Sequence, residues 1–392
     1  VSSINSDPAT WASNAWTAAS FNAQSGNNDE FVGTISGLSA GTYYYAFRYK
    51  LANSCNYQYG GYNANGGGFW NGTTNVNGTL TVLALPVANA GLDITDASTC
   101  GLDYVTLSAA ALSAGQSGAW TLSSGTNNTV VFNNPSSSTS TFTGSYGGTY
   151  VLQWALTSGG CTGTDQMTVT FNQPSDAAIS ALVGTGDLFW CGLTNTDWST
   201  ATNWYQKQAT GHYVRMSNSI PGLGNEVFTV STANAGICVG NNTPTLSVNS
   251  NAEDLYVGVG VTLNLSNDSM NIAQNLINQG TIVASTGTVN FTGSTNSIIS
   301  GFGNTQLFNM RVNKSAGATL TLQQPVLVTN NLNMVQGNVF TSSTNLLTLG
   351  STSSAPGSLT YNAGTIVGPF KRYFANAASA GTAGLFPVGT AV

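Results

Sequence analysis

The chain has 392 residues, of which 8 are Lys or Arg and 14 are Asp or Glu, so the formal net charge is −6. This charge argues against binding to nucleic acid, which requires clustered cations to displace counterions from phosphates. The sequence contains no run of 18 consecutive apolar residues, so no membrane-spanning helix is predicted. Because 41% of the residues are hydrophobic, the chain can build packed cores, and its length suits two to four domains.

Residues 1–86 are expected to form a first unit, an antiparallel β-sandwich rich in aromatic residues. A segment at 37–50 alternates aromatic residues with others, and residues 78–83 predict a later strand. The candidate ligand-binding residues are Tyr57, Tyr59, Tyr62, Phe69 and Trp70. Exposed aromatic rings could stack on sugar rings. The alternative, which the sequence favours, is that one face of each strand is core and the loop rings cover its edge.

Residues 87–175 predict a second β-sandwich, because short strand signals recur at regular spacing. The order Cys100, Trp120, Cys161 predicts an immunoglobulin-like core with the Trp packed against a disulfide. Three carboxylates near one end, Asp93, Asp96 and Asp103, could hold Ca²⁺ together with backbone carbonyls. The favoured alternative is that these are solvated loop carboxylates. Apart from Ca²⁺, no cofactor is expected.

A Ser/Ala/Gly linker is expected at about 175–184, followed by a third unit at 185–374. Short runs such as 261–265, 288–291 and 318–322 alternate apolar with small polar residues, and Asn, Gly and Ser separate them. Related phrases recur at 275–280 and 331–337. This pattern predicts a parallel β-helix, a solenoid whose coils bury one another's faces. Such a core needs a cover on its first coil, and Trp190, Trp198 and Trp204 are expected to supply it.

The five cysteines are sparse and well separated, which suits an oxidising compartment. The pairings that keep each bridge inside one expected unit are Cys100–Cys161 and Cys191–Cys238. Cys55 is then left over, as a buried thiol or as a residue whose partner lies upstream. The chain begins with Val and ends within an apparent strand, so we expect the natural protein to be longer, with residues 375–392 beginning a further segment.

Residues that could carry catalysis are scarce. The only histidine, His212, lies in an expected loop without an identifiable nucleophile. Glu253 and Asp254 are adjacent, so a strand would point them to opposite faces, and no Asp or Glu follows Asp268. We therefore expect no catalytic residues and no enzyme activity. Ser269, in Asp268-Ser269-Met270, is a candidate O-glycosylation site.

Three phrases carry a resemblance to known families. The aromatic unit resembles a small β module of secreted Bacteroidota proteins, and because that module normally has strands before residue 10, the resemblance implies that the copy here is incomplete. Ala88-Asn89-Ala90-Gly91 with Asp93 resembles the opening of PKD-type immunoglobulin-like domains. Residues 196–204 resemble the entry to surface-protein β-helices. Together they resemble a segment of a large cell-surface adhesin, of the gliding-adhesin kind, exported by the type IX secretion system of Bacteroidota. The resemblance implies an extracellular location, contact with that secretion machinery, and attachment to the outer membrane through a region outside this chain.

The sequence therefore predicts an all-β chain of two sandwich modules followed by a capped parallel β-helix. The expected function is that of a non-enzymatic adhesin or stalk segment that presents surfaces to polysaccharide or surface glycans. The first alternative is a self-assembling extracellular fibre or sheath subunit, because neutral rods can stack end to end. The second is a carbohydrate-active enzyme or its binding module. Neither nucleic acid nor membrane insertion is expected.

Overall fold

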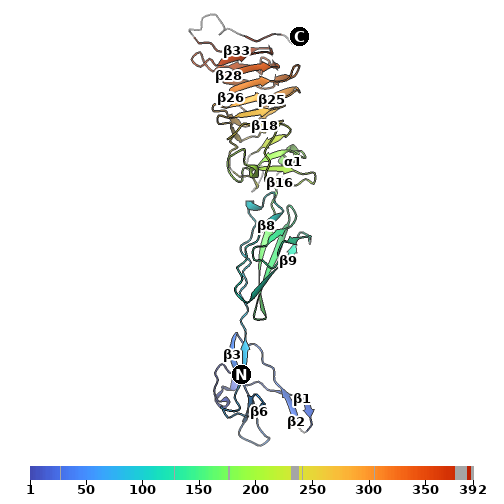
Figure 1. The fold of residues 1–392 in the computed structure, drawn as a ribbon, viewed down its shortest axis with the longest axis vertical. Helices are drawn as coiled ribbons and strands as arrows, with labels where there is room; N and C mark the ends of the chain where they lie inside the picture. The colour runs from blue at the N-terminus through green and yellow to red at the C-terminus, as the bar shows by residue number, and fades with distance from the viewer. Residues whose placement is uncertain are drawn as a thin grey trace.

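A computed structural model describes residues 1–26, 28–127, 129–174, 177–230, 238–240, 242–303, 305–375 and 386–389. The modules follow one another along one long axis, with the solenoid at the end opposite the first module (Figure 1). The chain is nearly all β, with 44% strand and 4% helix, as the sequence predicts. Most of the segment expected to begin a further domain, 375–392, lies outside the described residues.

The first module contains three small antiparallel sheets, β1-β2, β3-β7 and β4-β5-β6. Its elements are η1 (Pro8–Thr10), η2 (Ser13–Ala15), β1 (Ser20–Ser25), β2 (Asn28–Val32), β3 (Gly41–Tyr45), β4 (Phe47–Tyr49), β5 (Gln58–Asn63), β6 (Gly66–Phe69) and β7 (Gly78–Val82). Trp11 is its one hydrophobic side chain that is almost fully buried among the described residues. Since little apolar surface leaves water here, this module is held by sheet hydrogen bonds and half-buried ring contacts rather than by a closed core.

The second module is a sandwich of two three-stranded antiparallel sheets, β10-β11-β8 and β13-β12-β9. Its elements are η3 (Ala97–Thr99), β8 (Tyr104–Thr106), β9 (Gln116–Gly125), β10 (Val131–Phe132), β11 (Thr141–Thr143), β12 (Thr149–Ser158) and β13 (Cys161–Thr170). Along β12 the side chains of Tyr150, Leu152 and Trp154 alternate with half-buried ones and point into the core. Trp120 packs against Trp154, with ring centroids 5.1 Å apart, and not against a disulfide as expected.

The third module begins with α1 (Ala177–Leu182), which lies where a linker was expected. Ile179 of α1 is buried, so this segment is part of a packed core. The cap comprises β14 (Leu188–Trp190), η4 (Ala201–Asn203), β15 (Trp204–Lys207), β16 (Tyr213–Arg215) and β17 (Val227–Thr229). Trp190, Trp198 and Trp204 are buried and share one hydrophobic cluster with the solenoid core, which confirms the expected cover.

A parallel solenoid of about 6 turns occupies residues 250–372. Its strands are β18 (Ser250–Ala252), β19 (Leu255–Val257), β20 (Thr262–Asn264), β21 (Ser269–Ile272), β22 (Leu276–Asn278), β23 (Thr281–Val283), β24 (Thr288–Phe291), β25 (Ser297–Gly301), β26 (Thr305–Asn313), β27 (Thr319–Leu322), β28 (Val326–Gln336), β29 (Asn338–Phe340), β30 (Leu347–Leu349), β31 (Ser358–Tyr361), β32 (Ile366–Val367) and β33 (Phe370–Arg372). On one face Met270, Val289, Met310 and Leu332 lie in register on successive coils, and all are buried. The alternation predicted from sequence therefore places one apolar row inside and one polar row outside.

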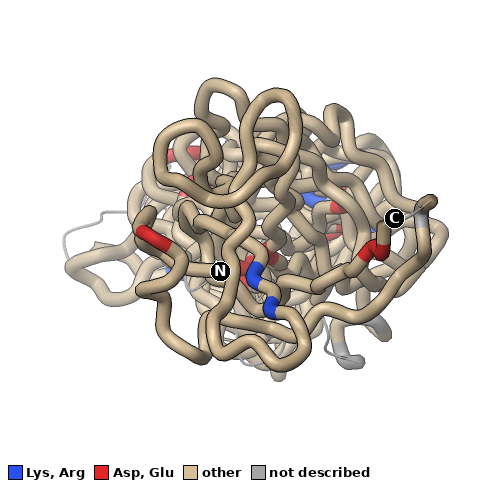
Figure 2. Tube along the Cα trace, turned by 90° about the horizontal axis from the view of Figure 1, so that it is seen from below, with Lys and Arg blue, Asp and Glu red and all other residues tan. Residues whose placement is uncertain are grey.

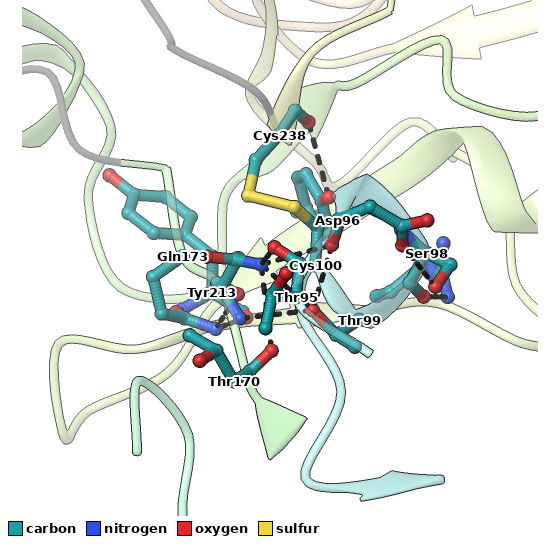
Figure 3. Close-up of a disulfide and its surroundings, with 12 residues drawn as sticks. Thr95, Asp96, Ser98, Thr99, Cys100, Thr170, Gln173, Tyr213 and Cys238 are labelled. Atoms are coloured by element: carbon teal, nitrogen blue, oxygen red, sulfur yellow. Dashed lines mark hydrogen bonds between the residues drawn. A yellow bond between two sulfur atoms is a disulfide. The ribbon is translucent and has the colours of Figure 1, made fainter. Parts of the chain in front are cut away.

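A disulfide joins the second and third modules (Figure 3). It links Cys100 to Cys238, so both expected pairings, Cys100–Cys161 and Cys191–Cys238, are wrong. Cys161 begins β13 and Cys100 lies beside Asn172, just past the other end of that strand. At about 3.3 Å per residue, ten strand residues separate the two cysteines by roughly 30 Å, far beyond disulfide reach. Cys55, Cys161 and Cys191 are free thiols, and Cys55 is exposed rather than buried.

The same junction is held by hydrogen bonds between the modules. The side chain of Gln173 donates to the carbonyl of Tyr213 at 3.1 Å and accepts from its amide at 2.8 Å. The amide of Arg215 donates to the carbonyl of Gly101 at 2.9 Å, and a Cβ at Gly101 would lie only 2.4 Å from the ring of Tyr205. These contacts and the disulfide join the sandwich to the cap as one continuous structure.

Candidate functional site

The two faces of the sheet β4-β5-β6 carry different side chains. Cross-strand partners share a face, and neighbours along a strand point to opposite faces. Gly60 lies between Phe47 on β4 and Phe69 on β6, and Tyr49 lies opposite Gln58, so these rings share one face. The ring centroids of Tyr49 and Phe69 are 6.4 Å apart. We call the set Phe47, Tyr49, Tyr62 and Phe69 the aromatic face. Its rings remain largely in solvent, with Tyr62 55% and Phe69 63% exposed.

A cavity of about 640 Å³ adjoins β4, with both Arg48 of the other face and Phe47 of the aromatic face in its lining. Arg48, opposite Tyr59 in the register, is one of the residues that line it. The Arg48 guanidinium carbon lies 4.5 Å from the centre of the Trp16 ring and 4.4 Å from that of Tyr57. We call this site the arginine pocket, defined by Trp16, Arg48 and Tyr57. Such cation–π contacts hold the guanidinium in place and leave hydrogen bonding to its N–H edge.

The charge around the arginine pocket is positive. The Nζ of Lys50 lies 5.4 Å from the centre of the Tyr57 ring, so a second cation adjoins the site. Within the described residues, no carboxylate forms an ion pair with Arg48. In this module the Glu30 carboxylate accepts from Asn22 on the β1-β2 hairpin, and the Asp7 carboxylate accepts from the amide of Ala9. Charged residues are sparse over the whole chain, as Figure 2 shows.

The structure separates the five aromatic residues expected to bind ligand. Tyr57 lines the arginine pocket, and Tyr59 is half-buried with its ring centroid 5.8 Å from that of Trp16. Tyr62 and Phe69 lie on the aromatic face. Trp70 is half-buried, and its ring packs over Gly72, where a Cβ would come within 3.2 Å. The expectation that these rings form or cover a core is therefore wrong for the aromatic face.

Sequence reasoning missed Trp16 and Arg48. Arg48 had a usable signal, because strand alternation separates it from Phe47 and Tyr49. No sequence pattern pointed to Trp16, because it lies outside any strand, just after η2. Its position follows only from the way the N-terminal segment folds back over the sheet.

The three carboxylates proposed for Ca²⁺ serve as hydrogen-bond acceptors or lie apart. Asp93 Oδ1 accepts from the amide of Thr168 at 2.7 Å. Asp96 caps η3 by accepting from the amide and hydroxyl of Ser98, and these bonds lower the pKa of its carboxyl. No group of three or more His, Cys, Asp or Glu that could hold a metal occurs in the part of the chain described, so Asp103 does not join the other two as a ligand set.

Carboxylates of the kind that an enzyme would need form a row at the start of the solenoid. Glu226 immediately precedes β17, and Asp254 precedes the neighbouring strand β19. Burial, then the charges of Asp187, Asp254 and Glu253, raise the pKa of Glu226. Glu253 accepts a hydrogen bond from Gln274, and Asp254 Oδ1 accepts from the amide of Asn275 at 2.7 Å, so both join neighbouring coils. None of these residues lines the arginine pocket.

The structure also places two residues discussed in the sequence analysis, the candidate glycosylation site Ser269 and the single histidine, His212. Ser269 begins β21 and is half-buried, and its amide donates to Asn249 Oδ1 at 2.9 Å. His212 is exposed, and its ring stacks on Tyr146 of the second module with centroids 5.8 Å apart. The histidine thus belongs to the junction between modules.

An asparagine ladder runs along the outside of one solenoid face. Asn251, Asn271, Asn290 and Arg311 occupy the same register position on successive coils. Asn271 donates to Asn251 at 3.0 Å, Asn290 donates to Asn271 at 2.8 Å, and Arg311 donates to Asn290 at 3.2 Å. Because the side-chain amides bond to one another, this ladder connects the coils and presents less free hydrogen-bonding capacity than its composition suggests.

Within the described residues, no helix has the length and apolar character needed to cross a membrane. A scan against known protein families finds none that matches the chain. A search of curated proteins likewise finds no match.

Proposed function

We propose that this chain is a non-enzymatic segment of an extracellular adhesin, in which a rod carries a saccharide-binding module at one end. The observation that carries the proposal is the aromatic face, because Tyr62 and Phe69 expose more than half of their surface in water. Flat rings of this kind match the apolar faces of sugar rings.

The remainder of the chain supports the role of a spacer. The solenoid is continuous with its cap, and the cap is joined covalently to the second module. A disulfide that closes a separation of 138 residues suits an oxidising exterior. The proposal includes a cell-surface location, export by the type IX system and attachment to the outer membrane through a region outside this chain, all on the sequence resemblance.

The proposal is tested by glycan-array binding of the purified chain, with electron microscopy of the same sample at rising concentration. We expect discrete rods that bind glycan, and loss of that binding in the variants Tyr62→Ala and Phe69→Ala. Tyr104→Ala is the matched control, because Tyr104 is equally exposed but lies in β8 of the second module. Filaments with a fixed axial repeat and no glycan signal would contradict the proposal and favour a self-assembling fibre.

A further inference from the structure

We propose that the arginine pocket binds a carboxylated sugar, such as a uronate or sialate residue, with Arg48 as the group that recognises the carboxylate. This inference rests on the proposed saccharide binding and adds to it a second subsite with a defined charge preference. Arg48 lies on the opposite face of the sheet from Tyr62 and Phe69, so these residues can be altered separately, although Phe47 of the aromatic face also lines the cavity.

The first argument concerns charge. Arg48 and Lys50 both lie against Tyr57, although only 8 of 392 residues are Lys or Arg and the net charge of the chain is −6. The described residues place no carboxylate in an ion pair with Arg48. A cation that lines a cavity without a carboxylate partner, with a second cation on the same tyrosine ring, favours an anionic ligand.

The second argument concerns preorganisation. Trp16 and Tyr57 hold the guanidinium at 4.5 and 4.4 Å from their ring centres, so little side-chain entropy is lost when it binds. A guanidinium presents its N–H groups as a planar fork that matches the two oxygens of a carboxylate. The partial exclusion of water by the two rings strengthens this ion pair relative to one in open solvent.

The third argument concerns the rest of the cavity. A volume of about 640 Å³ lies within the range of small-ligand pockets. Its lining includes the neutral side chains of Asn14, Thr17, Thr34 and Ser36. Amide and hydroxyl groups are the partners that sugar hydroxyls require, whereas Trp16 and Tyr57 are already packed against the Arg48 guanidinium and serve to hold it.

The test is an array of oligosaccharides in acid and neutral pairs: oligogalacturonate with its methyl ester, sialyllactose with lactose, and oligomannuronate with oligomannose. The whole chain is used, followed by titration of the best pair. We expect the acid member to bind at least about tenfold more tightly than the neutral one, and to weaken as NaCl is raised. Arg48→Gln should reduce the acid to the affinity of its neutral partner, and Arg48→Lys should retain part of the preference.

Tyr104→Ala serves as the control, and near-ultraviolet circular dichroism checks that each variant keeps its aromatic packing. Equal binding of acid and neutral members would overturn the inference while leaving the proposed function intact. An acid preference that survives Arg48→Gln would also overturn it. If no oligosaccharide of either kind binds, both the inference and the proposed function fail. The salt dependence is measured on the unaltered chain, so it remains informative even if Arg48→Gln disturbs folding.

Discussion

The first module and the solenoid use their aromatic and apolar residues in opposite ways. In the solenoid, Phe291 and the other core side chains are removed from water by the coils above and below, although Phe302, between β25 and β26, is 95% exposed. In the first module, Phe69 and Tyr62 lie on one sheet face and keep 63% and 55% of their surface exposed. Burial is the dominant source of folding free energy, so the buried side chains of the solenoid core stabilise the fold, whereas the rings of the aromatic face remain accessible for contact. Under the proposed function, the module that binds and the rod that is held by a closed core lie at different ends of the molecule (Figure 1).

The largest effect expected from this comparison is in the solenoid core. Phe291→Ala should lower the free energy of unfolding by about 3–5 kcal/mol, because it removes a fully buried ring and leaves a cavity between coils. Phe69→Ala makes the same chemical change on the aromatic face and should alter it by less than about 0.5 kcal/mol. Denaturant unfolding followed by circular dichroism measures both; equal losses would contradict the contrast.

The next largest effect on stability is expected at the junction between the second and third modules. Replacing both bridge cysteines, Cys100→Ala with Cys238→Ala, should cost about 2–5 kcal/mol, because the bridge restricts the unfolded chain. Cys55→Ala changes an exposed free thiol and should have no measurable effect on unfolding. Limited proteolysis between the second and third modules offers a second measurement. A double variant as stable and as resistant as the parent chain would show that the hydrogen bonds of Gln173 and Arg215 are sufficient alone.

A buried cation in the rod gives a prediction about pH. Lys314 is 1% exposed, and its Nζ donates to the carbonyls of Ala273 and Thr292 and to Ser297 Oγ. Burial lowers the pKa of Lys314 from 10.5 to about 8. Above pH 8 the unfolded state then binds more protons than the folded state, so stability should rise with pH between about 8 and 10. Lys314→Met should remove this rise, and an unchanged pH slope in that variant would contradict the assignment.

The same variant should also be less stable at neutral pH. Loss of the ammonium leaves two carbonyls and a hydroxyl without this donor in a dry interior, at a cost of about 2–3 kcal/mol. The unfolding midpoint at pH 7 measures it. A gain in stability would show that burying the charge costs more than its three hydrogen bonds return.

Sequence alternation was enough to predict the solenoid, because its period of two has a direct physical cause in burial. The tryptophan cover was also predictable, since an uncapped solenoid would expose its core. Other features could not be predicted from the sequence. The similar phrases at 275–280 and 331–337 lie in different sheets, β22 in the ten-stranded one and β28 in the eight-stranded one. All faces of a solenoid alternate alike, so phrase similarity does not identify the face.

Neither the cysteine pairing nor the arginine pocket was predicted from sequence, and the reason is the same for both. Pairing within modules was assumed, whereas Cys100 faces the cap across the module junction. The pocket likewise depends on Trp16, which reaches Arg48 from a segment without regular structure. Contacts made by irregular segments across long sequence separations leave no periodic pattern, and so residue order alone does not indicate them.

A smaller effect is expected in the asparagine ladder. Asn290→Ala removes one hydrogen bond to Asn271 and one from Arg311, and should cost about 1 kcal/mol. Asn267→Ala changes an exposed turn residue of the same solenoid and should be close to neutral. Thermal unfolding of the two variants side by side distinguishes a ladder that stabilises the rod from one that is merely solvated.

The most direct test of this division between binding module and rod is one glycan-array comparison of three whole chains. These are the parent, the double variant Tyr62→Ala with Phe69→Ala, and the ladder double variant Asn271→Ala with Asn290→Ala. We predict that the first double variant loses the glycan profile of the parent while the ladder variant retains it. Loss of the profile in the ladder variant alone would place adhesion on the rod and contradict the account.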